Sequence, residues 1–294
     1  MAPLDFSKPA EMVTALQQRQ KQADYIGGYE GVRTIPMYKE EVDRLGNILN
    51  TADAATQAQL MAGLSDGLGA KYLAPVMAQL EKKGEKARLF TTAAGVAQTD
   101  RGLARDILFG DEIRRANKSA VPSEATKIQP VIDSLYGNTF ELMPDARSAV
   151  VDAGLALYAN SANAKGDFSG SLDEQRLRDS MMRITGKPVA FNGRRALPPR
   201  ADMTQGQFDQ MMAGLTDADL GTLPKATDGS PVTADILRRA GQLVSAGDGR
   251  YLVLIKGHTV ADPANPNQDW KIDLRDVPVR PRRTPELKPN LGSP

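Results

Sequence analysis

The sequence of 294 residues contains no cysteine and a single histidine, His258. The absence of cysteine excludes disulfides, thiolate zinc sites, iron–sulfur clusters and cysteine nucleophiles. One imidazole cannot form a multi-histidine metal site, and a Ser–His–Asp triad would have to use His258. We therefore expect no metal and no cofactor in this protein.

Long hydrophobic runs are absent as well. No window approaches the roughly 18 consecutive apolar residues that a transmembrane helix needs. The first residues, Met-Ala-Pro-Leu-Asp-Phe, lack the basic and then apolar run of a signal peptide. We therefore expect a chain that has no transmembrane segment and is synthesised in the cytoplasm without a signal peptide.

Neither sign of charge dominates, because 37 Lys and Arg residues stand against 36 Asp and Glu residues. A chain-wide basic field that would wrap nucleic acid is thereby excluded, although a local basic patch is not. Phosphate-binding loops are also lacking. The run Gly67-Leu68-Gly69 lies between predicted helices instead of after a strand, which is not the context of dinucleotide binding.

The first two thirds of the chain have a helical pattern, and we predict a helical domain over residues 1–186. The expected helices cover residues 9–25, 37–49, 53–64, 70–82, 87–97, 103–116, 143–162 and 171–184. Short connections favour an antiparallel helical array. The helix over 143–162 is expected to be the longest and the deepest, with Leu155 among its buried side chains.

Residues 187–276 have a different texture, with prolines around short predicted helices at 204–215 and 233–243. The segment 250–256 is aromatic and β-branched, which favours a strand, and 270–274 is a second candidate. Together they predict an antiparallel hairpin packed on helices. Residues 277–294 contain five prolines and are expected to form an extended or disordered tail. The predicted fold class is mainly α, an antiparallel helical array with a small C-terminal β-hairpin and an extended Pro-rich tail.

A short internal match joins the two regions, because residues 59–66 and 210–217 share six of eight positions. A reused helix–helix corner explains such a match more simply than a true duplication. In that interpretation Gly63 and Gly214 adopt the left-handed conformation after a helix, and Ser65 and Thr216 cap the next element of the chain.

The residues offer little catalytic chemistry. His258 ends the predicted strand, and a histidine there is typical of a surface position. The adjacent carboxylates Glu40-Glu41, Asp111-Glu112 and Asp173-Glu174 lie on predicted helices, where neighbours point about 100° apart and do not face each other. Solvated faces or charges that suit a helix dipole are the simplest explanation of these pairs. A glycosidase would need two carboxylates across a cleft, which the sequence cannot show.

The tail supplies the candidate interaction residues. Arg280, Arg282, Arg283 and Lys288 face only one acidic residue, Glu286. Such an arm can hold phosphates, including those of DNA, by non-specific electrostatics, or can enter an acidic groove of a protein. A solubilising terminus is the alternative. The tail lacks the aromatic residues that stack on bases.

The order of features in residues 184–274 resembles a known family. The features are Ile-Thr-Gly-Lys at 184–187, Phe-Asn-Gly-Arg at 191–194, Pro-Pro at 198–199, Ala-Asp-Ile-Leu at 234–237, Gly-Asp-Gly-Arg-Tyr-Leu-Val at 247–253 and Trp-Lys-Ile-Asp-Leu at 270–274. They resemble the C-terminal region of large internal, ejection-type virion proteins of tailed bacteriophages and prophages. A similar region often lies downstream of a lytic transglycosylase domain there. Residues 89–110 and 153–159 are similar to the helical stretch before it.

The resemblance implies a virion protein that leaves the capsid with the DNA or lines its exit. Other virion proteins, a homo-oligomer and non-specific contact with DNA are the partners that we expect. The chain lacks the Glu-Ser and Gly-Leu-Met-Gln motifs of a transglycosylase site, so activity is not carried over. Two alternatives are a peptidoglycan-acting hydrolase, or an accessory to one, and a host-directed binding module that uses the basic tail.

Overall fold

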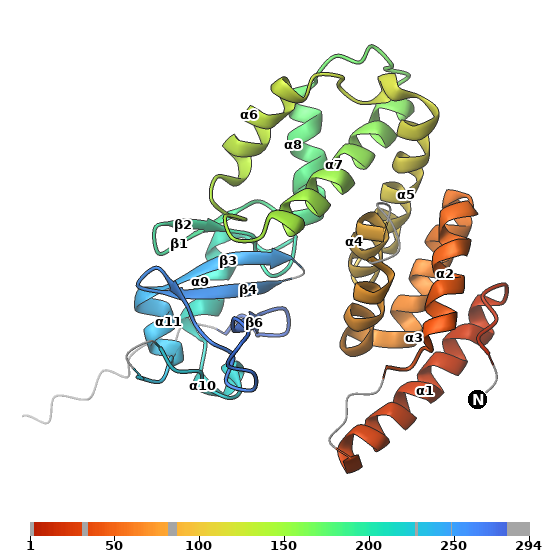
Figure 1. The fold of residues 1–294 in the computed structure, drawn as a ribbon. Helices are drawn as coiled ribbons and strands as arrows, with labels where there is room; N and C mark the ends of the chain where they lie inside the picture. The colour runs from red at the N-terminus through yellow and green to blue at the C-terminus, as the bar shows by residue number, and fades with distance from the viewer. Residues whose placement is uncertain (1–2, 31–34, 82–86, 227–228, 248, 281–294) are drawn as a thin grey trace, which may run out of the picture. The chain divides into compact units, whose positions relative to one another are not determined.

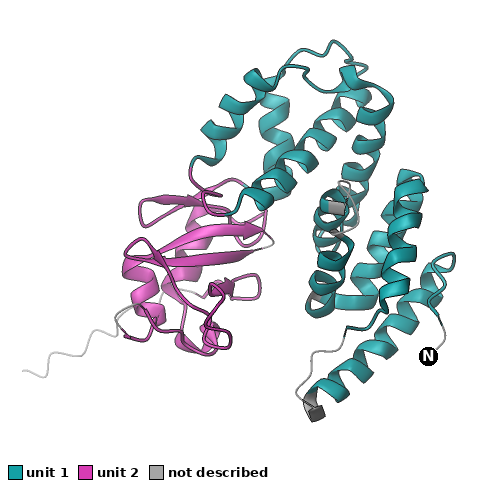
Figure 2. Cartoon of the chain, viewed as in Figure 1, with its two compact units in different colours: residues 1–137, 143–186 teal, residues 138–142, 187–294 magenta. Residues whose placement is uncertain are grey.

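The computed structural model describes residues 3–30, 35–81, 87–226, 229–247 and 249–280. The chain forms two compact units (Figure 2). The first contains residues 1–137 and 143–186, and the second contains residues 138–142 and 187–294. The chain is 58% helical and carries a small antiparallel sheet near its C-terminus, so the prediction of a mainly α fold is confirmed.

The first unit is built from helices alone among its described residues (Figure 1). Their bounds are α1 Pro9–Glu30, α2 Lys39–Thr51, α3 Ala54–Glu81, α4 Ala87–Ala97, α5 Arg101–Ala116, the 3-10 helix η1 Lys118–Ala120, α6 Ala125–Tyr136, α7 Pro144–Ala164 and α8 Glu174–Thr185. Helix α5 is central, because it packs against α3, α4 and α7. Asp100 caps it by accepting a hydrogen bond from Leu103 N at 2.8 Å, as its residue type favours.

Helix α3 differs from the prediction. The chain between the expected helices 53–64 and 70–82 is helical as far as Leu68, and the break comes at Gly69, whose φ of 57° and ψ of 175° are not helical. Leu64 and Leu68 are both fully buried, so the helix continues where its apolar face still contacts the core. The break at Gly69 divides α3 into two helical stretches, in keeping with the two helices expected here. Helix α1 has 22 residues and α7 has 21, so the prediction that the helix over 143–162 is the longest was wrong.

Helix α7 lies close to α5 because small residues face each other. An added Cβ at Gly110 would lie 1.8 Å from the carbonyl oxygen of Ala156. Ala153 and Ala156 are fully buried, as expected for the predicted Ala-rich stripe. Leu155 is only half-buried, however, and Leu157 is the leucine of this helix that lies in the core. The prediction that Leu155 is buried was therefore wrong by about half a helical turn.

The second unit combines short helices with two small sheets (Figure 1). Its elements are β1 Val189–Phe191, β2 Arg194–Ala196, α9 Gln205–Ala213, α10 Asp217–Leu220, α11 Ala234–Ala240, β3 Gly241–Gly247, β4 Arg250–Ile255, β5 His258–Thr259 and β6 Lys271–Asp273. Strand β4 is central in the larger sheet. It pairs antiparallel with β3 along its length, and with β5 and β6 at its two ends.

The predicted pairing of the two C-terminal strands is present, with Tyr251 opposite Ile272 in β4 and β6. The sheet is nevertheless larger than a hairpin, because residues 241–247 form strand β3 instead of continuing the helix predicted over 233–243. Helix α11 ends at Ala240. The physical reason is tertiary, since β3 supplies the hydrogen bonds that the second edge of β4 needs.

The internal match does not produce one shared structure. Gly63 lies inside α3, where an added Cβ would meet the side chain of Met12 at 2.6 Å. Gly214 ends α9 with φ of −88°, so neither glycine adopts the predicted left-handed conformation. Thr216 is the N-cap of α10, as expected, but Ser65 is helical. Similar sequences therefore continue a helix in one unit and end one in the other.

Candidate interaction site at the C-terminal segment

The segment 277–280 belongs to the second unit. Val277 is 6% exposed and is part of the hydrophobic core, and Val279 packs against that core. The prediction that an extended tail begins at residue 277 was therefore wrong. The apolar side chains at 277 and 279 alternate along the chain, and this alternation holds the segment on the unit before the basic residues begin.

Arg280 is fixed by three hydrogen bonds. Its Nη1 donates to the carbonyl oxygen of Gly214 at 2.6 Å and to Asp219 Oδ2 at 2.7 Å, and its Nη2 donates to Asp219 Oδ1 at 2.8 Å. This is the bidentate geometry in which a planar guanidinium matches a carboxylate. Arg280 was predicted as a residue of a free arm. Its charge is instead paired within the chain, which corrects that prediction.

Asp219 receives Arg280 because the turn before α10 positions it. Asp219 Oδ2 accepts from Thr216 N at 2.8 Å and from the Thr216 hydroxyl at 2.6 Å, which completes a capping box. The Arg280 guanidinium lowers the pKa of Asp219 well below its usual value of 3.8, against the opposing effect of burial, and Thr216 lowers it further. The sequence Thr216-x-x-Asp219 is the signal that could have identified this carboxylate.

The other three predicted residues of the arm, Arg282, Arg283 and Lys288, lie outside the described residues. The structure therefore places Arg280, the first residue of the basic segment, at the corner between α9 and α10. It brings Arg280 together with no other predicted site residue within the described part of the chain.

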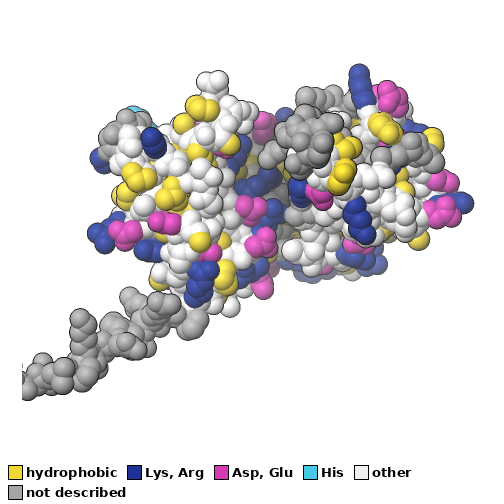
Figure 3. Space-filling model, turned by 90° about the horizontal axis from the view of Figure 1, so that it is seen from below, with side chains coloured by type: hydrophobic (Ala, Val, Ile, Leu, Met, Phe, Trp, Pro, Cys, Tyr) yellow, Lys and Arg dark blue, Asp and Glu magenta, His cyan; other side chains and the backbone are white. Residues whose placement is uncertain are grey.

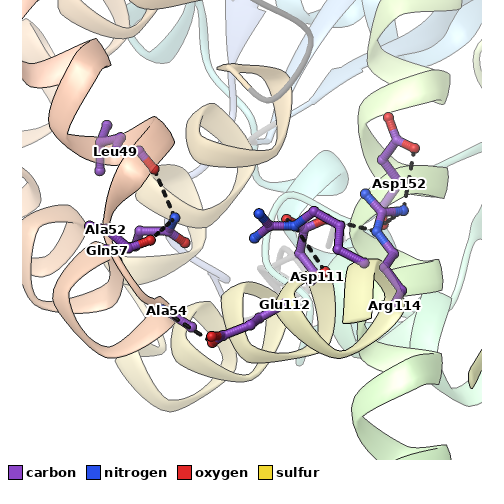
Figure 4. A network of polar contacts seen from close by, with 9 residues as sticks. Leu49, Ala52, Ala54, Gln57, Asp111, Glu112, Arg114 and Asp152 are labelled. Carbon is purple, nitrogen blue, oxygen red and sulfur yellow. Dashed lines mark hydrogen bonds and ion pairs between the residues drawn. The ribbon is translucent and has the colours of Figure 1, made fainter. Parts of the chain in front are cut away.

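A second polar cluster lies in the helical unit, around Asp111 of α5 (Figure 4). Arg114 Nε donates to Asp111 Oδ1 at 2.7 Å, and Arg115 Nε lies 2.9 Å from Asp111 Oδ2. Arg114 Nη1 also lies 3.8 Å from Asp152 Oδ1 on α7. Both oxygens of Asp111 thus face guanidinium groups, and the cluster connects α5 with α7.

The same network includes the connection between α2 and α3 (Figure 4). Gln57 Nε2 donates to the carbonyl oxygens of Leu49 and Ala52, at 2.8 and 3.0 Å, where α2 ends. Glu112 Oε2 accepts from Ala54 N at 3.3 Å, where α3 begins. These side chains satisfy backbone groups that have no partner inside their own helices.

Two of the adjacent carboxylate pairs have one buried member, which the interpretation as solvated faces did not include. Glu40 and Glu41 do lie in the first turn of α2, as the interpretation by the helix dipole expected. Asp111 is 4% exposed, and Glu41 is 4% exposed and paired with Arg19 through contacts of 2.6 and 3.0 Å. Burial raises the pKa of Glu41, but hydrogen bonds from Arg19 and from the N–H groups of Tyr38 and Leu4 outweigh it, and the net direction is downward. Asp173 caps α8, as its sequence position favours.

These observations bear on acid–base chemistry. Each described carboxyl group with a displaced pKa is displaced downward; the groups are Asp5, Asp24, Glu41, Asp53, Asp167 and Asp219. A glycosidase acid requires the opposite direction, because it must hold its proton near neutral pH. Exposed His258 stands in a two-residue strand. Among the described residues, no group of histidine and acidic side chains has the arrangement of a metal site, and no helix is long and apolar enough to cross a membrane.

No known protein family matches the chain, and comparisons with curated proteins and with solved structures found no match either.

Proposed function

We propose that this chain is a non-enzymatic structural protein of a tailed-phage virion, which acts in genome delivery by assembling with other virion proteins. The sequence resemblance over about residues 85–275 supports the virion context. The proposal places the chain in the particle, with homo-oligomeric and virion-protein partners and with DNA contact limited to non-specific electrostatics.

The observation that carries the proposal is how the buried charges are used. Glu41, Asp111 and Arg176 are each less than 10% exposed, and each forms an ion pair within its own unit. Arg176 pairs with Asp167 at 2.9 Å and lies over the ring of Tyr158. Removing one partner of such a pair leaves an uncompensated buried charge, so these pairs favour one fixed arrangement of the helices. Charges that fix the arrangement of helices in this way are consistent with a structural protein, which acts by presenting a defined surface to other proteins.

The outer surface supports the same proposal. On the face shown in Figure 3, basic and acidic side chains are interspersed over the described residues. A net charge of +1 supplies few cations in excess of acidic groups for neutralising phosphates. Binding to proteins through a surface of mixed sign is more consistent with this pattern than condensation of DNA.

Mass spectrometry of purified virions tests the proposal. Particles of the phage that encodes this chain are purified and washed, and the chain is quantified against the major capsid protein. We expect a fixed copy number in intact particles and a loss of the chain after genome ejection. Its absence from intact particles would overturn the virion assignment.

A turbidity assay on purified cell walls tests the hydrolase alternative. We expect no clearing by the purified chain. Clearing that disappears after a single carboxylate-to-amide change, with unchanged thermal stability, would establish an enzyme and contradict the proposal.

A further inference from the structure

The side chain of Asn192 joins the β1–β2 hairpin to the corner between α11 and β3, and we call this set of hydrogen bonds the latch. The amide nitrogen of Asn192 lies 2.7 Å from the carbonyl oxygen of Gly241, 3.1 Å from that of Arg238 and 3.4 Å from that of Leu237. Because all three neighbours are carbonyl oxygens, which only accept hydrogen bonds, the side-chain atom that faces them must be a donor. The amide nitrogen of Asn192 is such a donor and carries two hydrogens. Asn192 therefore donates hydrogen bonds to carbonyl groups at the C-terminal end of α11, which have no partner within the helix.

Asn192 also forms the turn of the hairpin. Phe191 pairs with Arg194, so the loop consists of Asn192 and Gly193 alone. Their φ angles are 46° and 79°, the left-handed values that a tight two-residue hairpin turn requires and that Asn-Gly adopts most readily. One residue thus closes the hairpin and holds it on the neighbouring helix.

The same two residues form the only Asn-Gly pair in the sequence. Such a pair is chemically reactive because the glycine has no side chain to hinder attack by its backbone nitrogen. The nitrogen of Gly193 bonds to Cγ of Asn192, the bond from Cγ to Nδ2 breaks, and ammonia leaves. Water then opens the cyclic succinimide to give aspartate or isoaspartate, so the reaction needs no oxidant and no cofactor.

We propose that Asn192 is a deamidation site whose conversion releases the β1–β2 hairpin from α11. A carboxylate at this position presents only acceptors to three carbonyl oxygens. It also places a negative charge at the C-terminal end of a helix, where the helix dipole is already negative. Repulsion replaces the hydrogen bonds, and the latch opens.

Release of the hairpin affects the core of the second unit. Val189 is 2% exposed, and the ring of Phe191 packs edge-on against Phe208 at 5.8 Å between centroids. Asn192 itself is exposed, so water reaches the turn. In the folded chain the three hydrogen bonds hold the amide on α11, and we expect them to slow the reaction relative to the unfolded chain.

Three variants of the full chain separate the latch from the turn. Asn192→Asp introduces one of the two products of deamidation, and Asn192→Gly keeps the left-handed turn but removes the donors. Asn265→Asp adds the same charge to an exposed loop of the same unit. We expect the melting temperature to fall by several degrees in Asn192→Asp, less in Asn192→Gly, and not at all in Asn265→Asp. If Asn192→Asp and the unchanged chain have the same melting temperature, the proposal that deamidation opens the latch is wrong.

Peptide mapping of the unchanged chain tests the modification directly, whether or not the Asp variant folds. The protein is incubated in mildly alkaline buffer, with and without denaturant, and deamidation is measured at each asparagine. We expect Asn192 to react before the exposed Asn267, more slowly without denaturant, and the modified fraction to melt at a lower temperature. Reaction at Asn192 no faster than at Asn267, an equal rate with and without denaturant, or unchanged melting of the modified fraction would contradict the proposal.

Discussion

The pair of Arg280 and Asp219 shows how a single residue changes role between sequence and structure. The two residues are 61 positions apart, and together they tie the end of the described chain to the α9–α10 corner. The side chain of Asp219 is 14% exposed, so its interaction with the guanidinium is only partly screened by water. The pair therefore contributes more than an ordinary surface ion pair.

Arg280→Ala should lower the free energy of unfolding by more than the loss of a fully exposed ion pair does, because charge-assisted hydrogen bonds to the partly buried Asp219 carboxylate are lost. Arg239→Ala is the matched control, since Arg239 pairs with Asp235 but is 78% exposed. The control should change the free energy of unfolding by less than about 0.5 kcal/mol. Denaturant unfolding followed by circular dichroism measures both. Equal effects of the two substitutions would show that Arg280 is not an anchor.

The lowered pKa of Asp219 predicts how the stability difference between the unchanged chain and Arg280→Ala depends on pH. The folded pKa is below the usual value of 3.8, so the ionised form stabilises the folded state above that pH. This contribution is lost as the pH falls toward the lower, folded value. The gap in melting temperature between the unchanged chain and Arg280→Ala should therefore be full near neutral pH and narrow in acid. A constant gap down to strongly acidic pH would contradict the assignment.

At the scale of elements, the contact between α5 and α7 depends on Gly110. The backbone of Ala156 approaches it so closely that no side chain fits between the helices. Steric exclusion of this kind couples two helices more tightly than interdigitated leucines do, because backbone atoms cannot rotate out of the way. The small residues of both helices are therefore a structural requirement.

Gly110→Ala should destabilise the helical unit by about 1–3 kcal/mol, the usual range for overpacking. Gly206→Ala in α9 is the control, because an added Cβ there meets nothing within 4 Å. Gly206 is the second residue of α9, so this change should stabilise by at most about 0.5 kcal/mol, the lower end of the range for a helix interior. Thermal unfolding of both variants measures the difference. A Gly110→Ala protein that melts like the unchanged chain would mean that α5 and α7 lie farther apart.

The environment of the larger sheet can be measured without any substitution. Trp270 is 5% exposed and is the only tryptophan in the sequence. Its fluorescence maximum should be blue-shifted in the native protein, because water is excluded from the indole, and should move to longer wavelength in denaturant. A native maximum equal to that of the unfolded chain would show that Trp270 does not pack in the core.

At the scale of the whole molecule, the chain has two units with separate hydrophobic cores, and the second unit is assembled from distant segments. Residues 138–142 belong to it although they lie in the sequence between helices of the first. Ser245 N donates to Thr139 O at 3.0 Å, and Thr139 is fully buried. Folding of the second unit therefore requires chain on both sides of α7 and α8.

Two truncations test where this unit ends. Truncation after Arg280 removes no described contact, and we expect an unchanged melting temperature and unchanged Trp270 emission. Truncation after Asp276 removes Val277, Val279 and the Arg280 anchor, and should lower the melting temperature of the second unit by several degrees. Equal stability of the two proteins would show that residues 277–280 are not part of the core. The longer protein is the one suited to virion-incorporation assays, because loss of incorporation can then be assigned to residues 281–294.

Local signals in the sequence determined a large part of the secondary structure. Asp100 and Asp173 mark helix N-termini because a short acidic side chain accepts a hydrogen bond from the N–H three residues later. The β-branched and aromatic run at 250–255 forms strand β4, as its composition favours. Helix α6 was missed, because Pro130 in its second turn is typical of a helix break. Val131, Ile132 and Tyr136 bury enough apolar surface to keep it helical.

Tertiary structure decided the features that depend on partners distant in the sequence. Glu41 and Asp111 look like surface carboxylates, and only the folded chain brings Arg19 to the first and encloses the second. Residues 59–66 and 210–217 are nearly alike, yet one segment continues a helix against Met12 and the other ends one beside Arg280. The sequence by itself determined composition, helix caps and the main strand, because those depend on neighbours within a few residues. Pairing of buried charges, the end of α11 and the anchoring of residues 277–280 depend on contacts across the fold, where burial and partner geometry outweigh local preference.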